Sequence, residues 1–265
     1  MNMRPDYKNW MPKGMVLGSA IGAGVSILLL IVFGCTPLLS SGGVKTVLTI
    51  VFAVLSLLMV VMTIWMFLMY RAFSYNGKRQ MSRQIIEGLA QHVHIPDGGV
   101  GLDVGCGSGA LTIACAKRNP NASMVGIDRW GKEYASFNQA LCEKNAKAEG
   151  VKNTSFKQGN AVKLEYDDGV FDVVTSNYVY HNIPSSDRQK ILLETLRTLK
   201  KGGSFVIHDI MSQGKYGDME AFARKLRALG YEKVELLDTT QGLFMTPFEA
   251  MWMGLSGSKI LIGKK

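Results

Sequence analysis

Charged residues are missing from two long stretches near the start of this 265-residue sequence, at positions 14–44 and 46–70. A bilayer core needs roughly 20 consecutive apolar residues, so the sequence predicts two membrane spans at about 15–34 and 46–70. The alternatives are two buried helices of a soluble core, or a signal peptide cleaved before Cys35. Soluble helices of this length normally carry a polar stripe, and a second apolar segment follows the first, so we favour a membrane hairpin.

Acidic residues are also rare before position 80, and this imbalance predicts the orientation of the hairpin. Residues 1–80 contain seven basic residues and one acidic residue, and six of the basic residues lie outside the loop between the spans. By the positive-inside rule, both termini and the rest of the chain face the cytoplasm, most simply at the plasma membrane of a prokaryote. We therefore divide the chain into a membrane hairpin at 1–80 and a second domain at 81–265.

Several site signatures are absent from the second domain. The cysteines lack paired metal-ligand spacing, so the sequence predicts no metal site. No basic stripe interleaved with aromatic residues occurs, which argues against a nucleic-acid partner. The pattern G-x-x-x-x-G-K-[ST] is missing, so a nucleoside-triphosphate loop is excluded.

Short apolar runs alternate with helical patterns from position 81 onward, which predicts a parallel sheet. A helix whose apolar face contains Ile85 and Leu89 comes first. Predicted strands follow at 99–105, 123–128, 154–159, 170–177, 204–210, 231–238 and 258–265, with helices that end near 116, 148, 199 and 229. The predicted fold class is α/β, with a doubly wound, mostly parallel, Rossmann-like seven-stranded sheet preceded by two transmembrane helices.

A glycine-rich loop follows the first predicted strand, in the segment VGLDVGCGSGALTI at 100–113. Gly105, Gly107 and Gly109 let a ligand approach the backbone and satisfy the dinucleotide pattern G-x-G-x-x-G/A. Asp128 ends the second strand, 19 residues after Gly109, where a carboxylate accepts hydrogen bonds from both hydroxyls of a ribose. These features alone suit a nicotinamide dinucleotide.

Asp103 argues against that ligand. It lies two residues before Gly105, where a carboxylate is poorly placed beside an anionic pyrophosphate but suits a ligand with an ammonium group. Polar residues also end the third and fourth strands, at 159–161 and 177–181. Since ligands of such sheets bind beyond the carboxyl ends of the strands, we expect a ligand and a second substrate to meet at this edge.

Five segments, in order, resemble the motifs of class I S-adenosylmethionine-dependent methyltransferases of the small-molecule type, which carry a generic methyltransferase domain. They are LDVGCGSGALT, VGID, GNA, FDVVTSNYVYHNI and LKKGGSFVIHDI. The resemblance covers about 85–265 and implies S-adenosylmethionine as the cofactor. It also implies that the backbone at Gly105, Cys106, Gly107 and Gly109 approaches the methionine part. Asp103 would hold the amino group, directly or through water.

The same resemblance implies further cofactor contacts at the ends of the next three strands. Asp128 would accept from the ribose hydroxyls, and Arg129 and Trp130 would border the adenine. Asn160 and Ala161 would reach the edge of the adenine, although the family often has an aspartate where Asn160 stands. Asn177 would line the face where the methyl group is transferred. Without a ligand, Asp128 would be read as a helix cap and Asn160 as a turn residue.

Methyl transfer is an in-line displacement, and it needs a base only if the acceptor carries a proton. The candidate bases are Tyr178, Tyr180, His181 and Asp209. We choose His181, with Tyr178 beside it, because a histidine titrates near neutral pH. The alternative is that His181 only packs or caps beside Pro184.

The N-P-P-Y signature of methyltransferases that act on DNA adenine or protein glutamine is absent, since the matching positions read SNYV. The hairpin instead predicts a hydrophobic or membrane-resident acceptor, such as a lipid, a quinone or an isoprenoid, with the lipid bilayer as a partner. An apolar cluster at 244–253 would cover the acceptor, rest on lipid or belong to the core. A nicotinamide-dependent oxidoreductase and a non-catalytic, membrane-tethered regulator that binds the cofactor remain as alternatives.

Overall fold

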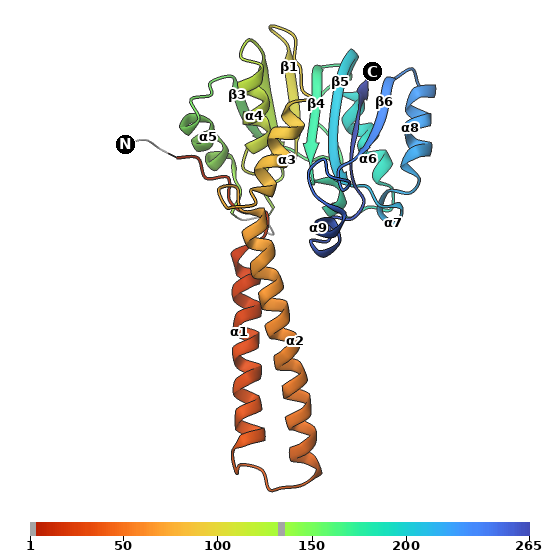
Figure 1. Cartoon of the computed structure of the whole chain (residues 1–265). Coiled ribbons are helices and arrows are strands. Elements are labelled where there is room, and N and C mark those ends of the chain that lie inside the picture. The colour runs from red at the N-terminus through yellow and green to blue at the C-terminus, as the bar shows by residue number, and fades with distance from the viewer. Residues whose placement is uncertain (1–3, 132–135) are drawn as a thin grey trace. The chain divides into compact units, whose positions relative to one another are not determined.

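The computed structural model describes residues 4–131 and 136–265 (Figure 1). Their contacts divide the chain into two units. One unit contains the described residues up to Lys8 together with Arg83–Lys265, and the other is Asn9–Ser82. Part of the helical segment predicted between the second and third strands, at 132–135, lies outside the described residues.

The smaller unit is a helical hairpin. Helix α1 (Lys13–Leu30) continues into a short π-helix, η1 (Ile31–Cys35), and α2 (Gly43–Phe73) returns. The stretches Lys13–Cys35 and Gly43–Phe73 have mean hydropathies of 2.5 and 2.9, and their length and composition suffice to cross a bilayer. Most of their large apolar side chains are exposed, which distinguishes them from the core helices of a soluble protein.

Small residues allow α1 and α2 to approach each other closely. Ser19, Ala23 and Ser26 are the buried positions of α1. A Cβ atom built on Gly22 would lie 2.3 Å from Cε of Met59 on α2, so no larger residue fits there without a shift. The hairpin therefore packs along a line of small side chains.

The larger unit is built around a seven-stranded sheet in the order β3-β2-β1-β4-β5-β7-β6. The strands are β1 (Val100–Val104), β2 (Ser123–Asp128), β3 (Thr154–Gln158), β4 (Phe171–Asn177), β5 (Leu199–Ile210), β6 (Glu232–Asp238) and β7 (Ser258–Lys264). The strands from β1 to β5 pair in parallel, and β7 runs antiparallel between β5 and β6. The predicted fold class is confirmed.

Helices connect these strands, and polar side chains mark where several of them begin. The helices are α3 (Met81–Ala90), α4 (Ala110–Arg118), α5 (Gln139–Ala148), η3 (Tyr180–Asn182), α6 (Arg188–Arg197), α7 (Gln213–Tyr216), α8 (Met219–Ala228) and α9 (Pro247–Trp252). Each of α5, α6, α8 and α9 has a cap whose side chain accepts a hydrogen bond from a backbone N–H in the first turn. These caps are Asn138, Asp187, Asp218 and Thr246, respectively.

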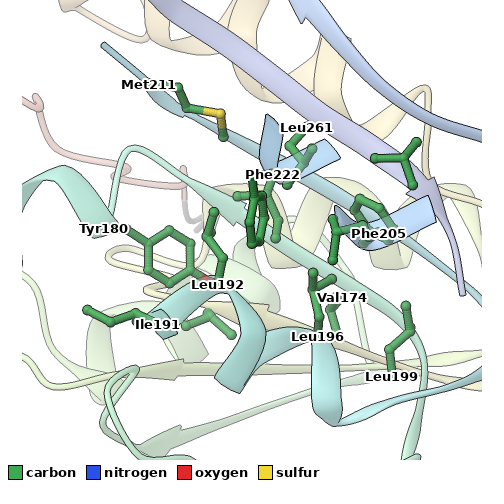
Figure 2. Packing of buried hydrophobic residues seen from close by; sticks show 14 of the residues in the cluster. Val174, Tyr180, Ile191, Leu192, Leu196, Leu199, Phe205, Met211, Phe222 and Leu261 are labelled. Atoms are coloured by element: carbon green, nitrogen blue, oxygen red, sulfur yellow. The ribbon is translucent and has the colours of Figure 1, made fainter. Parts of the chain in front are cut away.

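Alternation along β1 sends its side chains to two different layers. Leu102 and Val104 belong to a large apolar cluster that also contains Leu192 of α6 and Phe222 of α8 (Figure 2). Asp103 points to the other face, where its carboxylate meets the first turn of α4. Helices thus cover both faces of the sheet, as a doubly wound fold requires.

The strand predicted at 204–210 begins earlier in the structure, because β5 also includes Leu199–Gly203. Gly202 adopts a positive φ of 82°, and the register of β5 against β4 shifts between Phe171 and Val173. The N–H of Gly202 donates to the carbonyl of Lys265, and the N–H of Lys265 donates back to Gly203. This pairing joins residues more than 60 positions apart, so the local composition could not reveal it.

Strand β1 is the point where the order of the sheet reverses, because β2 lies on one side of it and β4 on the other. Such a switch point leaves a crevice beyond the carboxyl ends of the strands. The glycine loop, Asp128 and the segment after Asn177 all follow those ends. The topology therefore brings the predicted site residues to one edge.

Candidate active site

The glycine loop after β1 is shaped by left-handed backbone conformations. Gly105, Gly107 and Gly109 have φ values of 77°, 56° and 81°, which residues with a Cβ atom rarely adopt. A Cβ on Gly105 would lie 2.2 Å from Cγ2 of Val179. Among the described residues, no atom lies within 4 Å of a Cβ built on Gly107, so the loop is open there. The N–H of the buried Cys106 donates to a β2 carbonyl and fixes the loop against that strand.

Asp128 ties the end of β2 to this loop. Its Oδ2 accepts from the N–H of Gly107 at 2.9 Å, and its Oδ1 accepts from the N–H of Trp130 at 2.8 Å. The indole N–H of Trp130 donates to the carbonyl of Gly107 at 2.9 Å. Because a carboxylate accepts about four hydrogen bonds, Asp128 keeps capacity for two more donors. Arg129 is exposed beside it.

Asp103 lies behind the loop and is 1% exposed. Its Oδ2 accepts from the hydroxyl of Thr112 at 2.6 Å, and its Oδ1 accepts from the hydroxyl of Thr175 at 3.0 Å. Burial raises the pKa of Asp103 to about 6, although the two hydroxyls act in the opposite direction. A buried carboxylate with a raised pKa is stabilised by a cation brought close to it.

Asn160 lies exposed after β3, and its side chain stabilises a turn. Its Oδ1 accepts from the N–H of Val162 at 3.0 Å. The neighbouring Ala161 packs against the apolar cluster of the sheet. The turn occupies Oδ1 of Asn160, and the other polar group of this side chain is its N–H₂ group.

Asn177 ends β4, and a buried histidine on the neighbouring strand orients it. His208 Nδ1 lies 2.8 Å from Oδ1 of Asn177, and His208 Nε2 lies 3.1 Å from the hydroxyl oxygen of Thr239. Burial lowers the pKa of His208 to about 3, so the ring is neutral at physiological pH. A neutral ring held at both nitrogens fixes the amide of Asn177 beside the crevice.

His181 and Asp209 form a hydrogen-bonded pair across β4 and β5. His181 Nδ1 lies 2.5 Å from Oδ1 of Asp209, and the backbone N–H of His181 donates to Oδ2 at 3.2 Å. Burial acts to raise the pKa of Asp209, but the hydrogen bond and the charge of His181 hold it below its ordinary value. Because the carboxylate holds Nδ1, the second ring nitrogen, Nε2, can take part in proton transfer.

Tyr178 adopts a positive φ of 56°, which is uncommon for a residue with a side chain and often marks a functional site. Ser258 donates its hydroxyl to the carbonyl of Leu255, so Tyr178 donates its own hydroxyl to Ser258 at 2.9 Å. Burial raises the pKa of Tyr178 well above its ordinary value. The ring of Tyr178 contacts the rings of both His181 and His208, with centroid distances of 6.0 and 4.5 Å, respectively.

The structure brings the predicted residues together at the carboxyl ends of β1, β2, β3 and β4. Sequence reasoning missed three residues that support them: Thr112, Thr175 and Thr239. It placed His208 beside the candidate base Asp209 at the end of the fifth predicted strand but gave it no role. Thr112 had a local signal, because it lies nine residues after Asp103 in the first turn of the following helix. Thr175 and Thr239 lie far along the chain, and nothing nearby in the sequence marks them.

Comparisons with known proteins identify a family and several relatives for this chain. Residues 95–250 match a family described as a methyltransferase domain. A demethylmenaquinone methyltransferase from Lactobacillus johnsonii is 37% identical over 111 residues, 40% of this chain and 41% of that protein. An arsenite methyltransferase from Aquipseudomonas alcaligenes is 33% identical over 126 residues, 46% of this chain and 36% of that protein. The chain thus spans about two-fifths of the length of these curated relatives.

Solved structures share the fold. A geranyl diphosphate C-methyltransferase from Streptomyces coelicolor has a TM-score of 0.55 at 13% identity, covering 74% of this chain and 80% of its own. The cyclase SpnF has a TM-score of 0.54 at 19% identity, covering 72% of this chain and 85% of its own. At these identities the likeness shows the fold alone.

The sheet order and the family match identify a class I S-adenosylmethionine-dependent methyltransferase. The family match covers more than half of the sequence, and the chain belongs to the methyltransferase-domain family. The predicted family, enzyme class and cofactor are confirmed. The nicotinamide alternative is set aside by this membership.

Proposed function

We propose that this protein is a membrane-anchored methyltransferase that transfers a methyl group from S-adenosylmethionine to a hydrophobic, membrane-associated acceptor of quinone-like chemistry. The observation that carries the proposal is the presence, in one chain, of two bilayer-length apolar helices and this catalytic domain. Curated relatives named demethylmenaquinone methyltransferase support an acceptor that dissolves in the membrane. A tethered enzyme meets such an acceptor without removing it from the bilayer.

The residues of the cofactor end fit S-adenosylmethionine. When bound, this cofactor supplies a methyl group activated by a sulfonium centre. The open backbone at Gly107 receives the methionine part, and the buried carboxylate of Asp103 favours its ammonium group from behind the loop. Asp128 uses its remaining acceptor capacity for the ribose hydroxyls. In this proposal, Asn160 presents its free side-chain N–H₂ group to a ring nitrogen of the adenine.

The opposite end of the crevice receives the acceptor. His181 removes a proton from the acceptor, while Asp209 holds the imidazole ring and stabilises its protonated form. Asn177 and the ring of Tyr178 shape the space between the two ligands. Since Tyr178 donates its hydroxyl to Ser258 and its pKa is raised, we assign it to positioning and leave proton transfer to His181.

An apolar surface supports a hydrophobic acceptor. The predicted cluster at 244–253 divides into two parts in the structure: Phe244, Met245 and Met253 are buried, whereas Phe248 and Met251 of α9 are 67% and 63% exposed. Phe248 and Met251 are three residues apart on one helix, so their side chains lie on the same exposed face. We assign this surface to contact with the acceptor or with the lipid that carries it.

A labelling experiment tests the acceptor class. The full-length chain, purified in detergent, is incubated with a methyl donor that carries a tritiated methyl group, together with either lipid extract or soluble metabolites. We expect label in the lipid-soluble pool, and we expect Asp128→Ala to reduce it at low donor concentration. Label confined to the soluble pool would exclude a membrane acceptor. No transfer to either pool, despite cofactor binding, would favour a regulator that binds the cofactor without turnover.

The orientation of the hairpin has its own test. We propose that both termini and the catalytic domain face the cytoplasm, and that the loop containing Cys35 faces outward. Cys35 is exposed, whereas Cys106, Cys115 and Cys142 are buried. A membrane-impermeant thiol reagent should therefore label intact cells at Cys35, and Cys35→Ser should abolish the signal. Labelling only after the cells are opened would reverse the proposed orientation.

A further inference from the structure

Asn145 on α5 is fully buried and contacts the glycine loop. Its side-chain N–H₂ group donates to the carbonyl of Ser108 at 3.0 Å. Ser108 stands between Gly107 and Gly109, two of the three loop positions that take a left-handed conformation. The hydrogen bond therefore fixes the peptide groups that direct the loop toward its ligand.

The same amide also holds the N-terminal tail, which we define as residues 4–8. The N–H of Asp6 donates to Oδ1 of Asn145 at 2.7 Å, and Nδ2 of Asn145 donates to the carbonyl of Asp6 at 3.0 Å. Both main-chain groups of Asp6 are thus paired by one side chain. Tyr7 is buried beside it and donates its hydroxyl to Glu149, just after α5, at 3.2 Å.

An asparagine amide has two N–H groups and one carbonyl. Asn145 gives N–H groups to Ser108 and Asp6, and its carbonyl accepts from Asp6. If the tail leaves, a buried N–H and a buried carbonyl lose their partner at once, which is unfavourable away from water. The amide is then free to rotate toward other partners, and Ser108 loses its anchor.

We propose that the N-terminal tail is part of the cofactor site and that Asn145 acts as the positioning residue through which it works. The tail orders the glycine loop without touching the cofactor. Cofactor affinity then depends on residues that precede the first apolar helix, 139 positions before Asn145 in the case of Asp6. This inference rests on the proposed function, because it takes S-adenosylmethionine as the ligand of the loop.

The test uses the full-length chain in detergent and measures the Kd for S-adenosylmethionine by calorimetry. Deletion of residues 2–8 and the substitution Asn145→Leu should each raise the Kd at least tenfold. In an activity assay they should raise KM for the cofactor, while kcat at saturating cofactor stays within twofold. Gln139→Leu is the matched control, because it changes an exposed side chain on the same helix as Asn145, and the hydrogen bond of that side chain in the described residues goes to Glu143. Its Kd should stay within twofold of the unaltered chain.

A peptide of residues 1–8, added at several millimolar, separates positioning from general stability. It should restore tight binding to the chain that lacks residues 2–8, but not when that chain also carries Asn145→Leu. Unchanged affinity in the deleted chain, or a loss that the peptide does not reverse, would overturn the inference while the unaltered chain still binds. If the unaltered chain itself fails to bind S-adenosylmethionine, the proposed function falls and the inference falls with it.

Discussion

The glycine loop after β1 lies at the same edge of the sheet as a cluster formed by Asn177, His181, His208 and Asp209 at the ends of β4 and β5. The loop is built from main-chain groups, whereas this histidine cluster is built from side chains. The loop is made of main chain: three left-handed glycines and peptide groups that bond to β2 and to Asp128. The cluster is made of side chains, with His181 on Asp209 and Asn177 on His208. In the proposed function, the cofactor meets mostly main-chain groups and the acceptor meets side chains.

This contrast gives different expectations for substitution at the two ends. A change in the loop should act on binding and folding through main-chain conformation. A change in the cluster should act on the chemical step through one hydrogen bond. The following substitutions probe each end in turn.

His181→Ala at the acceptor end should have the largest effect. Loss of a general base lowers turnover by a factor of about 10²–10⁴. We expect kcat to fall by that factor and the Kd for S-adenosylmethionine to stay unchanged, as measured by tritium transfer and calorimetry. Asp209→Asn should lower kcat less and alter the pH dependence of kcat. If turnover is unchanged in His181→Ala, the cluster carries no proton transfer and only shapes the site.

Asp128→Ala at the cofactor end should weaken S-adenosylmethionine binding by about 10–100-fold, since hydrogen bonds to a charged group contribute about 1.5–3 kcal/mol. It should leave kcat at saturating cofactor nearly unchanged, the reverse of the result expected for His181→Ala. Calorimetry with NADH as a second ligand provides the control. Affinity equal to that of the unaltered chain would mean that Asp128 serves only as a cap for the N–H of Trp130.

Gly105→Ala and Gly107→Ala distinguish the cost of a steric clash from the cost of backbone strain within the loop. Both require a Cβ atom at a positive φ, but only the one at Gly105 meets Val179. We expect Gly105→Ala to lower the free energy of unfolding of the catalytic unit by about 2 kcal/mol and Gly107→Ala by about 1 kcal/mol. Thermal unfolding of both variants measures the difference. Equal losses would show that Val179 moves aside.

Asp103→Asn should change the free energy of unfolding by an amount that depends on pH. The folded-state pKa of about 6 lies above the ordinary value of 3.8, so protonation favours the folded state, and that stability is lost as the pH rises through 6. The variant should match the unaltered chain near pH 4, and above pH 7 its free energy of unfolding should be about 3 kcal/mol higher than that of the unaltered chain. Thermal unfolding without cofactor at both pH values tests this. A destabilised variant at pH 8 would show that the two threonines need the full carboxylate.

The strands and the glycine loop were predictable because their signals are local. The strand predicted at 123–128 has the same limits in the structure, and glycines spaced two apart indicate a loop. The acceptor end was predictable only as a set of polar residues. The pairing of His181 with Asp209 joins residues 28 positions apart, and the contact between Asp6 and Asn145 joins residues 139 apart. Such pairs depend on the packing of the finished sheet, which no local pattern encodes.

The position of β7 sets an order of events during synthesis. β7 is the sheet partner of β6 and covers the open side of β5, so the sheet is complete only after Ser258–Lys264 has emerged. The apolar helix α2 ends at Phe73, about 185 residues earlier. At roughly 5–20 residues per second, the ribosome needs on the order of 10–40 s to cover that distance. If the hairpin spans a membrane, as proposed, it therefore has time to insert before the sheet of the catalytic unit is complete.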